Sequence, residues 1–271
     1  MKPVTTEDHG AARHVVMSRP DRRNALDGML VQALAMELRL AADEPEIECV
    51  VLRGKGPSFC AGIDISTLRE LADGSRLRAV RADFVAVADL LEQMPKPTVA
   101  QIQGWCVGAG FELALACDLR VVSADAVLGL PETRIGAVPD VGGLARLGAL
   151  VGAGRAKELV LTSALVDGER AARLGIANRV SPTREELDAA TATLVDEVLT
   201  CSALANGLAK RVIDAATKPA LAATLEQELT AQLVCIESDR FRAGVDAFDA
   251  YLNSGVRGVP GPSGTRDGPL G

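Results

Sequence analysis

Short apolar runs alternate with longer amphipathic segments through the first half of the chain. The runs are rich in Val, Ile and Leu and end near glycine, proline or charged residues, which is typical of buried strands. The predicted strands occupy residues 14–18, 49–53, 98–103, 119–123 and 127–130. Because strands alternate with helical segments here, the pattern predicts an α/β architecture.

The helices between these strands are predicted from the three-to-four-residue spacing of apolar positions. Asp27 is suited to the N-cap of the first helix, because its side chain can accept a hydrogen bond from a free amide of the first turn. Pro95 ends the second helix, since proline disrupts a helix interior. The predicted helices cover residues 27–42, 77–94, 111–117 and 144–151.

From about Arg155 onward the chain changes to one helical segment after another, and only residues 176–180 resemble a strand. Pro219 is suited to a first helical turn. The helical region that it opens is predicted to run to Leu252, with an interruption near Asp239. The second half of the chain is therefore predicted to be mainly helical.

Three parts follow from this change of pattern. We predict a core over residues 1–195, a C-terminal helical region over 196–254 and a flexible tail over 255–271. The tail is assigned because Gly, Pro and Ser dominate it, and such a composition buries little apolar surface.

Charge and hydropathy restrict the expected partners. The formal net charge is −7, whereas a nucleic-acid-binding surface normally needs a positive excess. No run of about 18 uncharged apolar residues is present, so no membrane span is predicted. The first ten residues lack the apolar core of a signal peptide. We therefore expect a cytoplasmic protein that binds neither nucleic acid nor membrane.

Cysteine and histidine usage argues against a metal centre. The six cysteines contain no CxxC pair, and the two histidines, His9 and His14, both lie near the N-terminus. Neither a zinc site nor a disulfide framework is expected from this pattern. Acid–base chemistry near neutral pH is therefore expected to depend on carboxylates.

Three acids stand next to glycine-rich turns. Glu112 is alone in an apolar helix that follows Gly104–Gly110, a turn whose free amides can bind an anion. Burying an unpaired carboxylate costs on the order of several kcal/mol, so this acid indicates a function or a partner. Glu132 follows Pro131 at the end of a short strand, and Asp140 precedes a further glycine-rich stretch. Taken singly, these acids fit capping or ion-pair roles at least as well as catalysis.

Taken together, the segments around these acids resemble the crotonase family, also called the enoyl-CoA hydratase/isomerase superfamily. Four motifs occur in the order and spacing of that family: CAGID at 60–64, GAGFELALACD at 108–118, LPETRIG at 130–136 and VPDVGG at 138–143. An Asn-Ala-Leu sequence at 24–26 adds to the likeness, which covers roughly residues 10–255. Each motif alone is moderately specific, and four in register make the resemblance strong.

The resemblance implies a crotonase-like spiral of ββα repeats, followed by a C-terminal helical region that packs around a homotrimer, often doubled to a homohexamer. It also implies an acyl-CoA thioester as the substrate. Coenzyme A then belongs to the substrate, and neither a separate cofactor nor a metal is expected.

Catalytic residues are also implied by the resemblance. The backbone amides of Ala61 and Ala109 would form the oxyanion hole, and the best-known hydratases have glycine at the second of these positions. Glu112 and Glu132 fall on the two catalytic glutamates of the hydratases. Two carboxylates beside one water can together remove a proton from it and deliver another to carbon.

Further positions are expected to contact the substrate. Next to the two oxyanion-hole segments these are Gly62, Ile63, Asp64 and Gly108, with Asp64 expected mainly to stabilise its turn. The arginines near the CoA phosphates are expected to be Arg22 and Arg23, with Arg19 as a further candidate. Apolar residues that would line the acyl pocket or belong to the ordinary core are Leu68, Leu71, Phe84 and Val85.

Hydration of a 2-enoyl-CoA is the predicted reaction, because the chain has both glutamates. The main alternative is an enoyl-CoA isomerase. Asp140 resembles an acid of the dienoyl-CoA isomerases, and it would be catalytic only in that case, whereas it would otherwise cap a helix. A Δ3-Δ2 isomerase, a thioester hydrolase on the same scaffold and a non-catalytic binding protein are the remaining alternatives.

Overall fold

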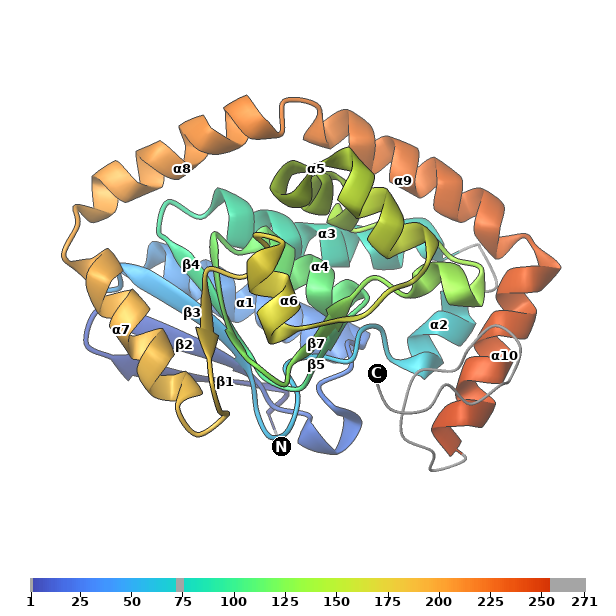
Figure 1. Cartoon of the computed structure of the whole chain (residues 1–271), viewed down its shortest axis with the longest axis horizontal. Helices are drawn as coiled ribbons and strands as arrows, with labels where there is room; N and C mark the ends of the chain where they lie inside the picture. Colours follow the sequence, from blue (N-terminus) through green and yellow to red (C-terminus); the bar gives the residue numbers. More distant parts are fainter. Residues whose placement is uncertain (1, 72–75, 254–271) are drawn as a thin grey trace.

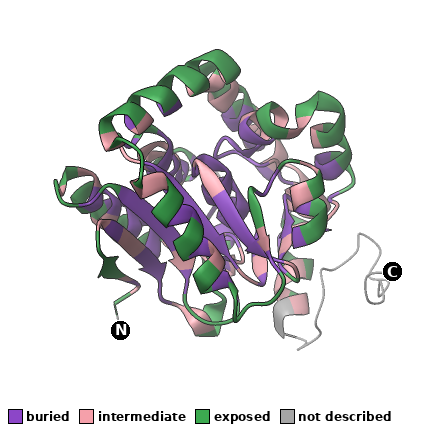
Figure 2. Cartoon of the chain, turned by 60° about the vertical axis from the view of Figure 1, so that its left-hand side comes forward, coloured by how far each residue is buried: buried purple, intermediate pink, exposed green. Residues whose placement is uncertain are grey.

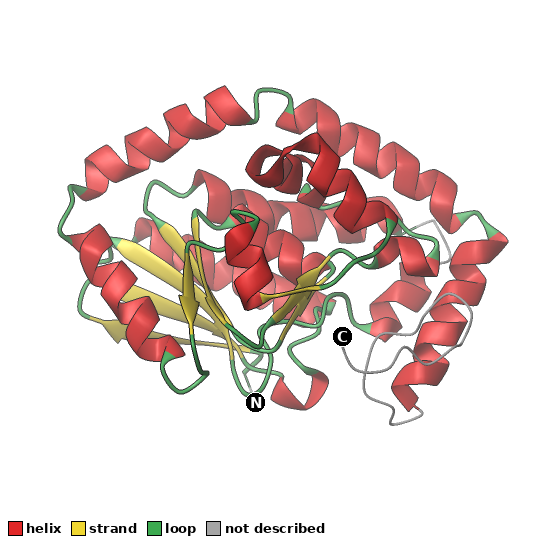
Figure 3. Ribbon diagram, in the orientation of Figure 1, coloured by secondary structure: helices red, strands yellow, loops and turns green. Residues whose placement is uncertain are grey.

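The computed structural model describes residues 2–71 and 76–253, and the predicted tail at 255–271 lies outside them. Two sheets occupy the middle of the described part, and helices enclose them (Figure 3). The predicted α/β class is confirmed.

The larger sheet has six strands in the order β1-β2-β3-β4-β6-β9. β1 and β2 form an antiparallel hairpin, and every later pair in this sheet is parallel. Its strands are β1 (Val4–His9), β2 (Ala12–Met17), β3 (Cys49–Gly54), β4 (Thr98–Ile102), β6 (Leu119–Ser123) and β9 (Arg179–Ser181). β1 was not predicted, because this polar edge strand lacks an apolar run.

Both faces of the larger sheet are covered, as is usual for parallel strands. In β3, Val50 and Leu52 belong to the main hydrophobic core, while Cys49 and Val51 face a second cluster that includes Leu194. Alternate residues of a strand point to opposite faces. The continuous apolar run that predicted this strand is therefore explained by burial on both sides. Figure 2 shows that the strands are largely buried and that the exposed residues lie mainly on the surrounding helices.

The smaller sheet contains three short strands in the order β5-β7-β8. β5 pairs with β7 in parallel, and β7 pairs with β8 antiparallel. The strands are β5 (Trp105–Val107), β7 (Val127–Gly129) and β8 (Val166–Asp167). β5 runs directly into a helix, so it places a glycine-rich turn at the end of the smaller sheet.

The helices of the core pack on the two faces of the larger sheet and beside the smaller one. α1 and α3 lie side by side, α4 contacts α3 and α5, and α7 contacts the opposite face of the larger sheet. These helices are α1 (Gly28–Asp43), α2 (Ile65–Leu71), α3 (Leu77–Gln93), α4 (Ala109–Ala116), α5 (Gly143–Leu161), α6 (Gly168–Arg173) and α7 (Leu187–Leu199), with two 3-10 turns, η1 (Pro20–Arg22) and η2 (Glu132–Ile135).

Local signals placed two helix boundaries correctly. The Asp27 side chain accepts a hydrogen bond from the Leu30 amide at 2.9 Å, so its predicted N-cap role is confirmed. α3 ends at Gln93, shortly before Pro95. α5 is longer than predicted and contains a kink at Gly152, whose φ of 77° lies in the left-handed region that glycine tolerates.

Three helices form an arm around the core: α8 (Ala203–Thr217), α9 (Leu221–Ile236) and α10 (Asp239–Asn253) (Figure 1). The break between α9 and α10 confirms the predicted interruption near Asp239. The predicted core boundary at residue 195 is wrong, because it falls inside α7. Leu187 and Leu194 bury that helix against the larger sheet, so the arm begins only at α8.

None of the helices within residues 2–71 and 76–253 combines the length and apolar character that a bilayer-spanning segment needs.

Candidate active site

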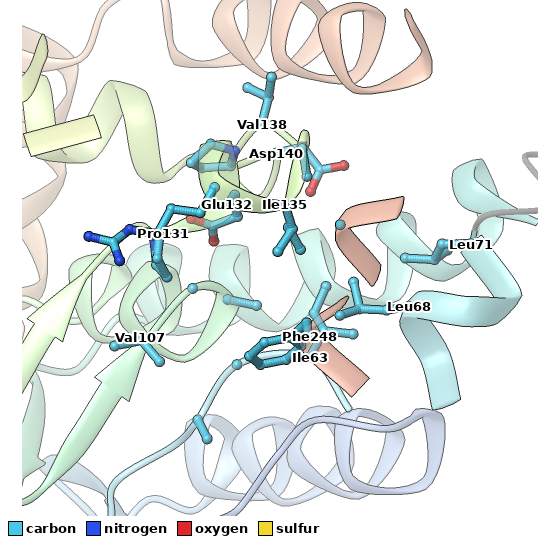
Figure 4. Close-up of a pocket in the computed structure, with 18 of the residues that line it drawn as sticks. Ile63, Leu68, Leu71, Val107, Pro131, Glu132, Ile135, Val138, Asp140 and Phe248 are labelled. Atoms are coloured by element: carbon cyan, nitrogen blue, oxygen red, sulfur yellow. The ribbon is translucent and has the colours of Figure 1, made fainter. Parts of the chain in front are cut away.

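A cavity of about 230 Å³ lies where the core meets the arm. Its walls come from the turn after β3, the start of α4, the segment around η2, and one face each of α2 and α10 (Figure 4). The wall is mostly apolar, and Ile63, Leu68, Leu71, Ile135 and Phe248 surround part of it. Three acids, Glu112, Glu132 and Asp140, also line it.

Two glycine-rich turns meet at this cavity. A β-carbon added to Gly62 would lie 3.0 Å from the Val107 carbonyl oxygen and 3.8 Å from the Ala109 nitrogen. Gly62 has φ of 90° and Gly108 has φ of 56°, which disfavour residues with a side chain. Glycine at these two positions therefore lets the backbones of the two turns approach each other closely.

The amide of Ala61 is already engaged within the fold. It donates to the Arg23 carbonyl oxygen at 3.0 Å, so the predicted oxyanion role of Ala61 is wrong. Leu26 pairs with Ile63 in a parallel bridge: the Leu26 amide donates to Gly62, and the Asp64 amide donates to Leu26. In such a bridge the amide of the central residue points away from its partner.

Ile63 therefore has a free amide on the cavity side of the turn. Within residues 2–71 and 76–253 its N–H has no acceptor, and the residue lines the cavity. Ala109 is the first residue of α4, and its N–H likewise has no acceptor in the described part of the chain. First-turn amides of a helix are normally left unpaired by the helix itself. The pair of amides available to a ligand is thus that of Ile63 and Ala109.

Glu112 lies in the first turn of α4, a helix whose eight residues are all buried. Its Oε1 accepts hydrogen bonds from the amides of Val141 and Gly143, each at 2.9 Å. Burial raises the pKa of Glu112, and these two amides and the nearby Arg146 and Arg81 oppose that rise. The carboxyl is fixed in place at the cavity wall by the loop that precedes α5.

Glu132 is held differently, at the start of η2. Its Oε1 lies 3.0 Å from the position of a β-carbon added to Gly108, so the carboxyl sits against the turn that carries the Ala109 amide. Its Oε2 is buried and has no hydrogen-bond partner in the described structure. Burial, together with the negative charges of Glu112 and Asp140, raises the pKa of Glu132 well above its usual value. This raised pKa favours the protonated form of the carboxyl.

Comparison with known proteins decides the family. The protein-family model described as enoyl-CoA hydratase/isomerase matches residues 7–253 of this chain. The chain belongs to the enoyl-CoA hydratase/isomerase family. It is 32% identical to an enoyl-CoA isomerase/hydratase of Mycosarcoma maydis, over 92% of this chain and 93% of that protein. It is 31% identical to a crotonyl-CoA hydratase of Syntrophomonas wolfei, over 86% of this chain and 89% of that protein.

Solved structures of this family share the fold. An enoyl-CoA hydratase from Mycobacterium avium subsp. paratuberculosis superposes with a TM-score of 0.83 at 28% identity, over 92% of this chain and 96% of that one. One from Bacillus halodurans gives a TM-score of 0.84 at 26% identity, over 90% and 99% of the two chains. The predicted crotonase-like fold with its C-terminal helical region is therefore confirmed.

Asp140 lines the cavity. Its side chain does not cap α5, so the capping role predicted as the alternative to catalysis is wrong. Gly142 is the N-cap of α5, and no side chain caps that helix. The Asp140 carbonyl accepts from Arg81 Nε at 2.6 Å, while its carboxyl Oδ2 lies 3.6 Å from the same nitrogen. Burial and the negative charge of Glu112 raise the pKa of Asp140 to about 8, against the opposing effect of Arg81.

The predicted CoA-binding arginines are separated by the structure. Arg23 lines the cavity, whereas Arg19 and Arg22 line a second pocket near the start of the chain. Arg19 is engaged with Asp27 at 3.0 Å and with Asp64 at 3.1 Å. Asp64 also accepts from the Ser66 amide and hydroxyl and lies outside the cavity wall, so it stabilises the turn, as the sequence analysis expected.

Only part of the apolar wall of the cavity was predicted from the sequence. Leu68 and Leu71 line the cavity, but Phe84 is buried in the main core. Val85 packs against that same core. Missing from the prediction were the cavity residues of α10, which are Arg240, Ala243, Gly244, Ala247, Phe248 and Tyr251. No local motif marks them, because only the path of the arm brings α10 to the cavity.

Proposed function

We propose that the chain is an enoyl-CoA hydratase that adds water across the double bond of a 2-enoyl-CoA. The observation that carries this proposal is the placement of two free amides, the buried Glu112 and the half-buried Glu132 around one apolar cavity. The family is that of the enoyl-CoA hydratases and isomerases. Within that family, a pair of glutamates suits hydration best, because hydration needs one proton removed and another delivered.

In the proposed reaction, the thioester carbonyl oxygen accepts hydrogen bonds from the amides of Ile63 and Ala109. Addition to the β-carbon turns the thioester into an enolate, whose negative charge gathers on that oxygen. Amides fixed in advance stabilise this charge without reorganising, and losing one such donor typically costs about 10²–10³ in rate. Ala109 in place of the glycine of the best-known hydratases keeps this donor.

The two glutamates divide the proton transfers. Glu112, stabilised as an anion by two amides, accepts a proton from water as the water oxygen bonds to the β-carbon. Glu132, whose raised pKa favours the protonated form, delivers a proton to the α-carbon. The atoms of one water are then accounted for, and a proton passes from Glu112 back to Glu132 through solvent to restore the enzyme.

An enoyl-CoA isomerase that uses Asp140 is the second candidate. The observation that favours it is that Asp140 lines the same cavity, with a buried carboxyl oxygen that has no hydrogen-bond partner in the described structure. A carboxyl in that state is able to exchange a proton with a substrate carbon. Glu132 would then serve with Asp140, and no water would be added.

A substrate comparison tests the two candidates. The protein is incubated with crotonyl-CoA, with longer 2-enoyl-CoAs and with a 3,5-dienoyl-CoA. The hydratase proposal predicts loss of the enoyl-thioester absorbance, with 3-hydroxyacyl-CoA as the product identified by mass. A new conjugated-diene absorbance from the 3,5-dienoyl-CoA, without hydration of any 2-enoyl-CoA, would instead establish the isomerase.

We further propose that the chain assembles into a homo-oligomer, for which the outer face of α8 offers a surface. Leu204, Leu208, Val212 and Ile213 on that helix are each more than half exposed. Burying large apolar side chains on association is favourable, at about 25 cal/mol per Å². Light scattering is expected to report a trimer or hexamer, and Leu208→Glu with Val212→Glu to dissociate it. A monomeric wild-type protein would contradict this proposal.

A further inference from the structure

The loop before α5, residues 138–143, is hydrogen-bonded to α9 of the arm as well as to Glu112 of the core. The Val138 amide donates to Gln232 Oε1 at 2.8 Å, and the Gly142 amide donates to Glu228 Oε2 at 2.8 Å. Arg81 links the loop to α9 as well: its Nε donates to the Asp140 carbonyl and its Nη2 to the Leu225 carbonyl, each at 2.6 Å. α9 therefore contacts this loop directly through Glu228 and Gln232 and indirectly through Arg81 of α3.

Three consecutive amides of the loop alternate between two carboxylates. Val141 and Gly143 donate to Glu112, and Gly142, which lies between them, donates to Glu228. Gly142 has φ of 88°, in the left-handed region, and a β-carbon there would lie 2.3 Å from an Arg146 nitrogen. The loop thus has little freedom to tilt toward one acid without withdrawing its amide from the other.

Glu228 is 2% exposed, and only one of its carboxyl oxygens has a partner in the described structure. The charged groups that face it are Glu112 from α4, Arg81 from α3, Arg146 from α5 and Asp140 from the loop. Burying an acid beside two other acids costs stability. An apolar residue there would avoid that cost but would leave the buried Gly142 amide without an acceptor.

We propose that Glu228 of α9 is a positioning residue for Glu112: by accepting from the Gly142 amide, it holds the loop so that the Val141 and Gly143 amides both face the catalytic carboxylate. This inference rests on the proposed function. It assigns to the C-terminal arm a part in catalysis besides lining the cavity. The acceptor oxygen of Glu228, and not its charge, carries the effect.

Three substitutions separate the acceptor from the charge. Glu228→Gln keeps an oxygen within reach of Gly142 and removes the charge, so kcat is expected to stay within about threefold of wild type. Glu228→Asp keeps the charge but withdraws the oxygen by one methylene, and Glu228→Leu removes the acceptor. Both are expected to lower kcat at least tenfold with KM changed less than threefold, because a misplaced Glu112 impairs proton removal more than substrate binding. Glu226→Leu, on the exposed side of the same helix, is the matched control.

Amide hydrogen exchange of a peptide covering residues 138–145 gives a readout besides activity. Exchange is expected to speed up in Glu228→Asp and Glu228→Leu and to match wild type in Glu228→Gln and Glu226→Leu. If Leu does not fold, the Asp and Gln pair still decides the outcome. Normal kcat in Glu228→Asp, or a tenfold loss in Glu228→Gln, would overturn the positioning role. A wild-type protein without hydratase activity would instead overturn the proposed function, and the exchange data would still report on the loop.

Discussion

Two groups of buried charges lie on either side of Arg146, and they differ in how they are paired. On one side, Glu92 of α3 accepts from Arg146 Nη2 at 2.9 Å and from Nε at 3.1 Å, and it also contacts Lys218. On the other side, Arg146 donates to the Val141 carbonyl at 2.7 Å, in the loop that holds Glu112. We call the first group the ion-pair cluster (Glu92, Arg146 and Lys218) and the second the site acids (Glu112, Glu132, Asp140 and Glu228).

Pairing reverses the effect of burial on the acids. Burial alone would raise the pKa of Glu92, but Arg146 and Lys218 hold it below its usual value. The buried Oε2 of Glu132 has no such partner in the described structure, and the pKa of Glu132 is raised well above the usual value. The ion-pair cluster is typical of a structural role, in which each charge has a counter-charge. Glu132, Asp140 and Glu228 each keep one carboxyl oxygen without a hydrogen-bond partner in the described structure. Of these, Glu132 and Asp140 line the cavity, where a substrate is able to use them.

The largest expected effect is on turnover, and it is expected at Glu132, whose Oε2 has no hydrogen-bond partner in the described structure. Glu132→Gln is expected to lower kcat for crotonyl-CoA by at least about a hundredfold, because a positioned proton donor is lost. The thermal midpoint of unfolding should stay level or rise, since no ion pair is broken. Steady-state kinetics and calorimetry measure the two quantities. Unchanged turnover would contradict the role given to Glu132.

Glu112→Gln tests the acid that the loop fixes in place. We expect hydration to fall by about 10²-fold through loss of the base, while the dissociation constant for CoA stays near wild type, measured by calorimetric titration. An amide oxygen still accepts from Val141 and Gly143, so the loop should keep its position. Full hydration activity in this variant would contradict the role given to Glu112 as the base.

Glu92→Gln tests the ion-pair cluster, where we expect a loss of stability and not a loss of turnover as large as at Glu132. Removing one partner of a buried pair typically costs about 3–5 kcal/mol, because the remaining charge stays buried. Chemical denaturation should show this loss in the free energy of unfolding, with a smaller loss of turnover than Glu132→Gln causes. Turnover that falls as far as in Glu132→Gln would mean that the ion-pair cluster is part of the catalytic machinery.

The two groups should also respond oppositely to pH. Asp140, with a pKa of about 8, and Glu228, with a pKa of about 7, keep protons in the folded state that the unfolded chain loses above about pH 4. Their contribution to stability therefore falls as pH rises from about 4 to about 8. The lowered pKa of Glu92 has the reverse sign, and its contribution is lost as pH falls below about 4.

Denaturant titrations at several pH values between 4 and 8 measure how the free energy of unfolding changes with pH. Glu228→Gln removes one of the two titrating groups, so it should flatten the decline between pH 5 and 8. Equal slopes in wild type and variant would show that Glu228 does not titrate in this range.

The smallest expected effect belongs to Asp140. Asp140→Asn should change hydration of crotonyl-CoA by less than about threefold, since the Asp140 contact with Arg81 Nε at 2.6 Å uses the backbone carbonyl. Kinetics of the purified variant, with circular dichroism to verify folding, measures this. Loss of activity in a folded variant would move the assignment to the dienoyl-CoA isomerase.

Much of the fold and of the site followed from the sequence. Strands buried on both faces leave continuous apolar runs, such as 49–53, and an isolated acid in an apolar helix identified Glu112. The turns at Gly62 and Gly108 were also readable, because left-handed backbone strongly favours glycine. These features depend on neighbours within a few residues, so the local pattern contains them.

The direction of an amide is not contained in that pattern. In a regular strand the amides of residues 61 and 63 would point the same way, but the left-handed turn at Gly62 breaks the alternation. Ala61 then donates to Arg23, and the Ile63 amide is left for a ligand. Only the pairing with the 23–26 segment determines which of the two is free.

Contacts between distant segments were likewise decided by the tertiary structure. Gly142 and Glu228 are 86 positions apart, and α10 reaches the cavity only because the arm bends around the core. The sequence by itself determined which residues favour helix, strand or tight turn, since those preferences are local. The folded chain alone decided which amides are free and which acids are unpaired, because both depend on what lies opposite each group in space.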